Sequence, residues 1–195
     1  MWVVIEGGIP MAMLFQHRSW RGLALALVIA SSACTTVTVT PQATQPPPQT
    51  YHVVIIGKGD NPDPRTAYLD TYFREGLMRR LGELKAFDNV SQTPPATAAP
   101  DTLFVTGWVS EADKGDEALR FFVGMGAGRE HVTGQLELKN SDGQSLGRLE
   151  IRKAYSGGMG MGGATVIDLE ELSKQVGEQA AQTLFDWSKG KPVAN

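Results

Sequence analysis

The segment "EHVTGQLELKNSDGQSLGRLEIRKAY", residues 130–155, carries the clearest structural pattern in the chain. Two runs of alternating apolar and polar residues flank the dipeptide Asp142-Gly143, which is typical of a β-hairpin turn. If this dipeptide forms the loop, Leu136 lies opposite Leu149. Apolar side chains then share one face, and oppositely charged side chains meet across the other. The sequence therefore predicts a β-hairpin in this register.

Glycine-rich runs adjoin the hairpin on both sides, "FFVGMGAGRE" at 121–130 and "SGGMGMGGA" at 156–164. Extending the register outward places methionines of each run opposite glycines of the other, so that large side chains lie over bare backbone. We expect one continuous glycine ribbon that offers a candidate interaction surface. Its residues are Gly124, Met125, Gly126, Gly128, Arg129, Gly158, Met159, Gly160 and Met161.

Three other interpretations of the glycine runs fit less well. A dinucleotide-binding loop requires a third glycine where Arg129 stands, and a helix rather than a strand after it. A Walker loop requires a glycine-lysine pair followed by serine or threonine, which the chain lacks. Copper binding by methionines is disfavoured because the register places Met125 on the face opposite Met159 and Met161. We therefore expect no cofactor and no metal.

The N-terminus has the layout of a secretory signal. "HRSWRGLALALVIASSAC", residues 17–34, contains basic residues, a short apolar run, small residues and then the only cysteine. The apolar run is too short to cross ~30 Å of hydrocarbon as a helix. We expect residues 1–33 to be a signal peptide. Residues 1–10 break the signal pattern, which makes Met11 or Met13 the expected start.

The segment Ser31–Cys34 resembles the lipobox of bacterial lipoproteins, although leucine is usual where Ser31 stands. The resemblance implies lipidation of Cys34 and an anchor in a membrane. Thr35 follows the cysteine, where lipoproteins of the inner membrane typically carry aspartate, so the resemblance implies the outer membrane. Ordinary signal-peptidase cleavage at the same bond stays open, because small residues also satisfy that enzyme.

A tether is expected next. Residues 34–50 are rich in threonine, glutamine and proline, which favours an extended segment. The alternative for "TTVTVT", residues 35–40, is a short strand. We expect residues 51–190 to form a single periplasmic domain and residues 191–195 to form a tail.

Two amphipathic helices are predicted in that domain. One starts at Asp63-Pro64, a good N-cap and first-turn pair, and runs to about Phe87. The second covers residues 165–189, with Asp168 as a capping residue. Each carries an apolar stripe at helical spacing: Leu69, Tyr72, Phe73, Leu77, Leu81 and Leu84 in the first, and Leu169, Leu172, Val176, Ala180, Leu184 and Trp187 in the second.

Strands are predicted at 51–57, at 102–110 and, briefly, within 87–92. With the hairpin, the expected order is strand, helix, several strands, helix. This order predicts an α+β fold in which both helices pack on a mostly antiparallel sheet.

Composition and motifs argue against several functions. The formal net charge of -3 gives no reason to expect nucleic acid as a partner. Downstream of the signal, the histidines are His52 and His131, and neither belongs to a zinc motif or to a nucleophile-base set. We therefore expect that the protein is not an enzyme.

The run from Phe121 to Trp187 resembles a bacterial lipoprotein family catalogued as a domain of unknown function, number 4410. The shared elements are Gly124, Gly126, Gly128 and Arg129, then a strand, a D-G turn, a strand, a glycine patch and a closing helix. The family resemblance supports location and fold without a mechanism. Our functional hypothesis is a lipid-anchored, non-catalytic protein-interaction module that faces the periplasm and docks on another envelope protein. The alternative is a lipoprotein that binds a small ligand or a peptidoglycan fragment.

Overall fold

The computed structural model describes residues 35–43, 47–115, 130–155 and 168–192. The chain divides into two compact units, Met1–Ser32 and Ala33–Asn195, and the described residues all belong to the second. The expected signal peptide therefore lies outside the described residues.

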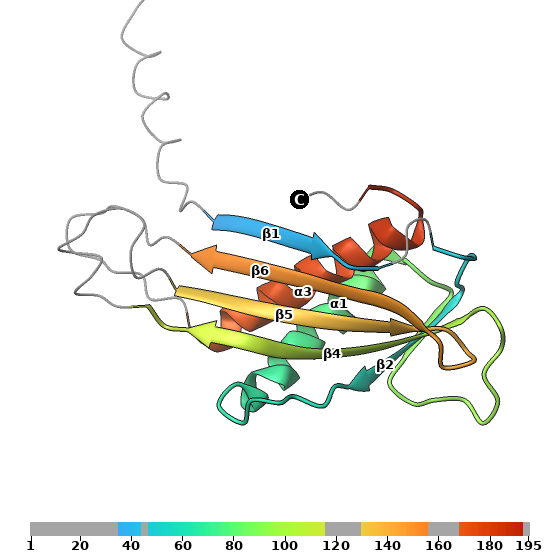
Figure 1. The fold of residues 1–195 in the computed structure, drawn as a ribbon, viewed down its shortest axis with the longest axis horizontal. Coiled ribbons are helices and arrows are strands. Elements are labelled where there is room, and N and C mark those ends of the chain that lie inside the picture. Colours follow the sequence, from blue (N-terminus) through green and yellow to red (C-terminus); the bar gives the residue numbers. More distant parts are fainter. Residues whose placement is uncertain (1–34, 44–46, 116–129, 156–167, 193–195) are drawn as a thin grey trace, which may run out of the picture. The chain divides into compact units, whose positions relative to one another are not determined.

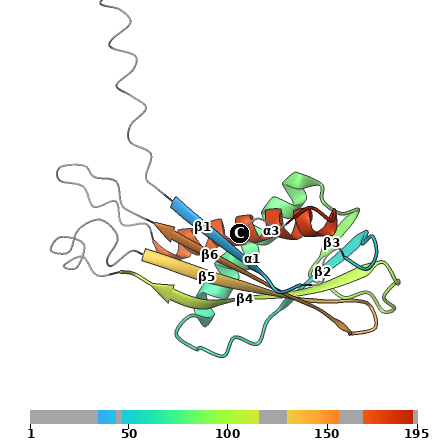
Figure 2. The same cartoon turned by 45° about the horizontal axis from the view of Figure 1, so that its top comes forward.

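The described elements form a two-layer α+β domain (Figure 1). In chain order they are β1 (Thr35–Pro41), β2 (Val53–Lys58), the 3-10 helix η1 (Ala67–Leu69), α1 (Asp70–Leu84), β3 (Asn89–Ser91), β4 (Thr102–Asp113), β5 (Glu130–Lys139), β6 (Ser145–Tyr155) and α3 (Leu169–Ser188). The strands make one six-stranded sheet in the order β1-β6-β5-β4-β2-β3. Figure 2 shows α1 and α3 together on one face of this sheet. The predicted α+β class and the two helices are confirmed.

The prediction of a mostly antiparallel sheet is wrong, because the sheet is mixed. Strands β1, β6, β5 and β4 pair antiparallel, whereas β2 runs parallel to both β3 and β4. The reason is the connection: α1 lies between β2 and the strands that follow it, and such a crossover lets both strands run in the same direction.

The predicted element order and tether are also corrected by β1. Residues Thr35–Pro41 form a strand that pairs with β6, with Val39 opposite Ile151. The alternation explains the pairing, since Val39 is buried while Thr38 and Thr40 are exposed. The described order therefore begins with two strands before the first helix.

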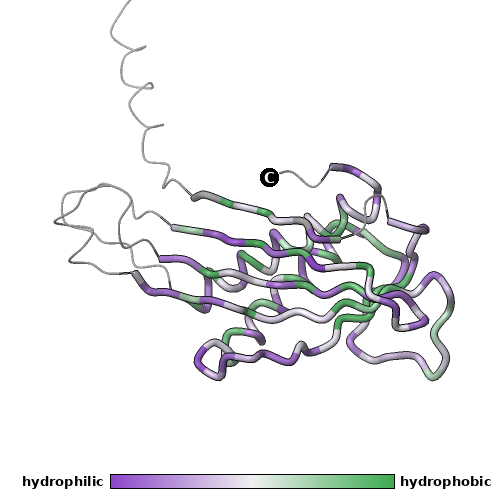
Figure 3. The backbone as a smooth tube through the Cα atoms, in the orientation of Figure 1, coloured by the Kyte–Doolittle hydropathy of each residue, from purple (hydrophilic) through white to green (hydrophobic). Residues whose placement is uncertain are grey.

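The hairpin register is confirmed. Leu136 lies opposite Leu149, and Glu137 lies opposite Arg148. The prediction of a two-residue loop is wrong, because the turn spans Asn140–Gln144. The register shifts between Leu138 and Lys139, so that Lys139 lies opposite Ser145. Figure 3 shows hydrophobic and hydrophilic residues alternating along these strands.

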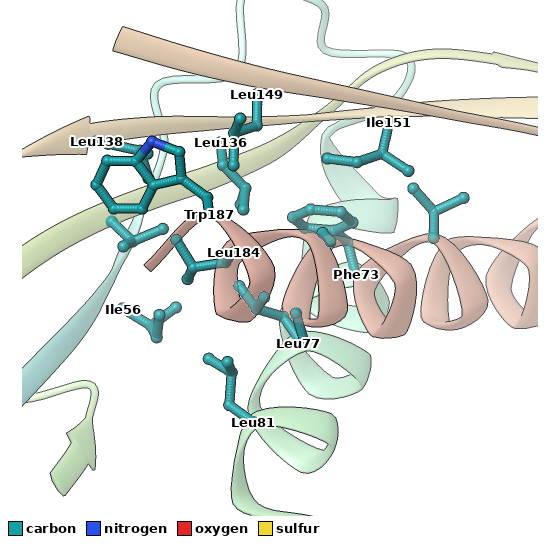
Figure 4. Close-up of a cluster of buried hydrophobic side chains, with 14 of the residues drawn as sticks. Ile56, Phe73, Leu77, Leu81, Leu136, Leu138, Leu149, Ile151, Leu184 and Trp187 are labelled. Atoms are coloured by element: carbon teal, nitrogen blue, oxygen red, sulfur yellow. The ribbon is translucent and has the colours of Figure 1, made fainter. Parts of the chain in front are cut away.

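Both apolar stripes face the sheet, as predicted. Phe73, Leu77, Leu184 and Trp187 are fully buried against sheet residues such as Ile56 (Figure 4). The two helices cross so closely that a Cβ added at Gly177 would overlap the carbonyl oxygen of Phe73. The described helices do not have the length and apolar character that a membrane span requires.

The helix boundaries differ from the prediction at the first helix. Asp63 caps a turn, since its Oδ1 accepts a hydrogen bond from Arg65 N at 2.9 Å, but α1 begins only at Asp70. Residue Lys85, in the left-handed region at φ 48°, ends α1. In α3, Asp168 is the N-cap and accepts a hydrogen bond from Glu170 N, as expected for a capping residue.

Candidate functional site

The predicted glycine ribbon and the predicted anchor lie outside the described residues. This applies to Cys34, Gly124, Met125, Gly126, Gly128, Arg129, Gly158, Met159, Gly160 and Met161. The described residues that flank both glycine runs meet at one end of the sheet. There Asp113 pairs with His131, and Glu130 pairs with Tyr155. The candidate site described below lies near this end of the sheet.

A β-bulge in β4 is the central feature near this end of the sheet. The pairing between β4 and β5 shifts between Val109 and Glu111. Bulges re-aim side chains and occur often beside functional sites. Here the bulge leaves the backbone groups of Val109 to be satisfied by side chains from outside the sheet.

Three polar side chains hold the bulge. Asp70 Oδ1 accepts hydrogen bonds from Val109 N at 2.8 Å and from Asn61 Nδ2 at 2.9 Å. The carbonyl oxygen of Val109 accepts from Thr66 Oγ1 at 2.8 Å and from Asn61 Nδ2 at 3.0 Å. Asp70 is 1% exposed, so these bonds lie in a medium of low dielectric constant. The start of α1 is thereby fixed against the bulge.

A cleft of about 260 Å³ opens beside the bulge. Its walls come from the loop before α1, from β4 and from the first residue of α3. The lining residues are Asp63, Arg65, Thr66, Tyr68, Leu69, Ser110, Glu111, Ala112 and Leu169. Tyr68 is 51% exposed, while Leu69 beneath it is fully buried. The cleft thus combines an accessible aromatic ring with charged and hydroxyl groups.

The charged groups of the cleft are already paired. The guanidinium of Arg65 donates to both carboxylate oxygens of Asp63, with Arg65 Nη2 and Asp63 Oδ2 2.8 Å apart. Glu111 contacts His131 at 3.2 Å and Arg152 at 3.5 Å, and it accepts a hydrogen bond from Thr133 Oγ1 at 3.3 Å. Each of the two carboxylates therefore has a cationic or hydrogen-bonding neighbour.

These contacts lower the pKa of both carboxyl groups. The hydrogen bond with His131 is the largest influence on the pKa of Glu111, and it outweighs desolvation, which raises that pKa. Hydrogen bonds from the Arg65 side chain and backbone lower the pKa of Asp63. Both groups are ionised at neutral pH, where they accept hydrogen bonds and cannot donate a proton.

The sheet face away from the helices is polar around a buried tryptophan. Gln135 donates to Glu150 across the β5–β6 pair at 3.1 Å. Trp108 is 8% exposed, and the guanidinium of Arg148 lies 5.5 Å from its ring centroid. This cation–π contact holds the arginine over the ring. The face offers hydrogen-bonding groups around one aromatic patch.

Metal binding has no candidate in the described part of the chain. No group of three or more histidine, cysteine, aspartate or glutamate side chains is placed there to hold an ion.

The fold and the cleft define a small α+β domain in which two helices cover one face of a mixed sheet and the other face stays polar. The chain belongs to the family of the domain of unknown function DUF4410, whose model matches residues 58–158. The domain family predicted from the sequence is confirmed, although the matched region starts earlier than predicted and ends before α3, and the lipoprotein character stays a prediction. It contains the bulge and every cleft residue except Leu169.

Among solved structures, the chain is similar to the PelC dodecamer from Paraburkholderia phytofirmans. The identity is 14% with a TM-score of 0.39, covering 75% of this chain and 94% of that chain. A variant PelC dodecamer from the same organism gives 15% identity and a TM-score of 0.36, covering 82% of this chain and 99% of that chain. No curated protein matches the chain.

Sequence reasoning missed the residues that build the cleft. Asp63 was expected only as a helix cap, and Asn61, Asp70 and Tyr68 had no expected role. The one available signal was "DNPDP", residues 60–64, because Asn and Asp before proline favour local side-chain hydrogen bonds. That signal predicts a turn, but it cannot show that the turn packs against β4.

Proposed function

We propose that the chain is a lipid-anchored protein of the bacterial envelope, held on the outer membrane through Cys34 and facing the periplasm. In this proposal it is a non-catalytic module that docks on another envelope protein. A sheet edge supplies the docking surface, because exposed backbone groups can pair with a strand of the partner.

The observation that carries the proposal is the character of β1. This strand lies at the edge of the sheet, and on its other side no described strand pairs with it. Soluble proteins usually protect such edges with charges, prolines or bulges. Apart from Pro41 at its end, β1 contains only threonine and valine, and Val37 is 38% exposed. An uncharged β-branched edge is therefore suited to strand addition.

The position of β1 in the chain supports the same proposal. The strand begins at Thr35, directly after Cys34. An acylated Cys34 would hold this edge close to the membrane surface, where a membrane-bound partner would meet it. The lowered pKa of Asp63 and of Glu111 supports the non-catalytic part, since a carboxylate with a lowered pKa is a weak general base.

In-cell crosslinking tests the docking proposal. A photoreactive amino acid at Thr38, which is exposed on β1, should give a discrete adduct with another envelope protein. The matched control is Thr97, an exposed threonine in the loop that follows β3 at the opposite edge of the sheet. We expect no adduct from Thr97. Failure of Thr38 to give an adduct, or the same adduct from both sites, would contradict docking through β1.

The second candidate is binding of a small ligand or a peptidoglycan fragment. The cleft beside the bulge favours it, because its aromatic ring and polar groups converge on one space. A melting shift induced by a ligand, in the absence of any crosslinked adduct, would support this candidate over docking.

A further inference from the structure

Tyr68 is an exposed aromatic residue in the wall of the cleft. Among the described residues, the large hydrophobic side chains that stay exposed are Val37 and Tyr68, at 38% and 51%. Val37 belongs to the edge strand, whereas Tyr68 belongs to the cleft wall. A tyrosine ring presents a flat apolar face and a polar tip, which suits a ligand with both characters.

We propose that this cleft binds one neutral pyranose unit of a glycan chain. The C–H bonds on one face of a pyranose ring carry partial positive charge and pack on the negative face of an aromatic ring. Its hydroxyl groups both donate and accept hydrogen bonds. The proposal rests on the second proposed function, ligand binding, and is independent of docking through β1.

The size of the cleft fits a single ring. Its volume of about 260 Å³ lies just below the range of roughly 300–1,000 Å³ that holds a drug-sized ligand. The lining combines charged, hydroxyl and apolar side chains, which disfavours a purely apolar ligand. One sugar unit of a longer chain fits this volume and this mixed lining, because the neighbouring units of the chain can extend into solvent.

The charges of the cleft favour a neutral sugar. An anionic ligand would meet the ionised carboxylates of Asp63 and Glu111. A cationic ligand would have to compete with Arg65 and Arg152, which already contact those carboxylates. A neutral ligand needs no change in these pairs, and its hydroxyls can use the remaining lone pairs and N–H groups.

The cleft is pre-organised for such a ligand. Thr66 lines the cleft, and its hydroxyl donates a hydrogen bond to the carbonyl oxygen of Val109 in the bulge. Asp70 accepts a hydrogen bond from the N–H of the same Val109. Glu111 is oriented by Thr133 and His131. Because these side chains are held before binding, little conformational entropy is lost when a ligand enters.

Saturation-transfer NMR on the purified full chain in detergent micelles tests the proposal. The probe is the trisaccharide of β-1,4-linked N-acetylglucosamine, and maltotriose is the second sugar. We expect saturation of the N-acetylglucosamine trimer by the wild-type chain, and binding about tenfold weaker in Tyr68→Ala. Tyr68→Phe should retain binding, because the ring face is kept. Val37→Ala, outside the cleft, should bind like the wild type.

Each outcome decides a different point. Preference for N-acetylglucosamine points to an amino-sugar glycan such as peptidoglycan, and equal signals from both sugars point to pyranose glycans in general. No signal from either sugar, or binding unchanged in Tyr68→Ala, would overturn the proposal. The dipeptide L-alanyl-D-glutamate is the third probe. If only this dipeptide binds, and its binding depends on Tyr68, the proposal of a sugar ligand is overturned, whereas the proposal that the cleft binds a ligand is supported. An unchanged melting temperature of Tyr68→Ala would confirm that the variant is folded.

Discussion

Asp70 brings a carboxylate into the interior of the domain, where it is 1% exposed. Its Oδ1 joins the start of α1 to the β4 bulge, because it accepts hydrogen bonds from both Val109 N and Asn61 Nδ2. The side chain thus fixes the start of α1 against the bulge, beside the cleft.

We predict that Asp70→Ala lowers the free energy of unfolding by about 2–3 kcal/mol. The hydrogen bonds from Val109 N and Asn61 Nδ2 are lost, and the buried N–H of Val109 is left without its acceptor. Urea denaturation of the purified chain measures the change. The control is Asp60→Ala, an exposed carboxylate in the loop that follows β2, which should change stability by less than about 0.5 kcal/mol. Equal effects of the two substitutions would show that Asp70 does not anchor the bulge.

The lowered pKa of Glu111 predicts that the stability of the fold depends on pH. Its folded-state pKa is lowered, chiefly by the hydrogen bond with His131, so its ionised form stabilises the folded state. This contribution is present above the ordinary carboxyl pKa of about 4.3 and is lost as the pH falls through the lowered value. The side chain is 54% exposed, so the contribution is at most about 1 kcal/mol.

The stability difference between the wild type and Glu111→Gln should therefore be largest near neutral pH and should shrink below about pH 4. Melting temperatures recorded between about pH 3 and 7 measure this difference. A difference that grows as the solution becomes more acidic would contradict the lowered pKa.

At the scale of elements, the crossing of α1 and α3 depends on glycine. A Cβ at Gly177 would overlap the backbone of Phe73, and one at Gly76 would overlap the backbone of Lys174. We predict that Gly177→Ala destabilises the fold by about 1–3 kcal/mol, because the helices must separate. Thermal or urea unfolding of the wild type and of Gly177→Ala measures this change in stability.

Gly82→Ala is the matched control, because it lies in α1 with no atom within 4 Å of an added Cβ. It should stabilise the chain by about 0.5–1 kcal/mol through helix propensity. Stabilisation of similar size in Gly177→Ala would mean that the helices do not cross as described.

The elements also show what the sequence could predict. The β5–β6 register was predictable because a slip of one residue would expose Leu136 and Leu149. Both apolar stripes were predictable from their helical spacing. The direction of β2 was not, because the apolar run "VVII", residues 53–56, indicates a strand buried on both faces, which occurs in parallel sheets and also in the cores of sandwiches.

The candidate site was less predictable than the fold. The β4 bulge depends on Asp70 and Asn61, which are distant from Val109 in the chain, and no local pattern marks such a contact. The strand β1 was mistaken for a tether because proline-rich residues follow it, although its alternation of threonine and valine fits an edge strand. Local patterns therefore predicted elements, and tertiary contacts decided the cleft.

Taken as a whole, the molecule presents two surfaces to which we assign separate roles. The edge strand β1 would dock on a partner next to the anchor at Cys34. The cleft beside the bulge would bind one sugar unit. Substitutions at Val37 and Tyr68 separate these roles, because the two residues belong to different elements and neither is buried.

We propose above all that the chain acts by contact at a membrane to which an acylated Cys34 holds it. Mass spectrometry of the N-terminal peptide, from protein purified out of the membrane fraction, shows whether this anchor exists. We predict a chain that begins at Cys34, carries acyl groups and takes up labelled palmitate, with no label in Cys34→Ala. A chain recovered from the soluble periplasm with an unmodified Cys34 thiol would contradict the account.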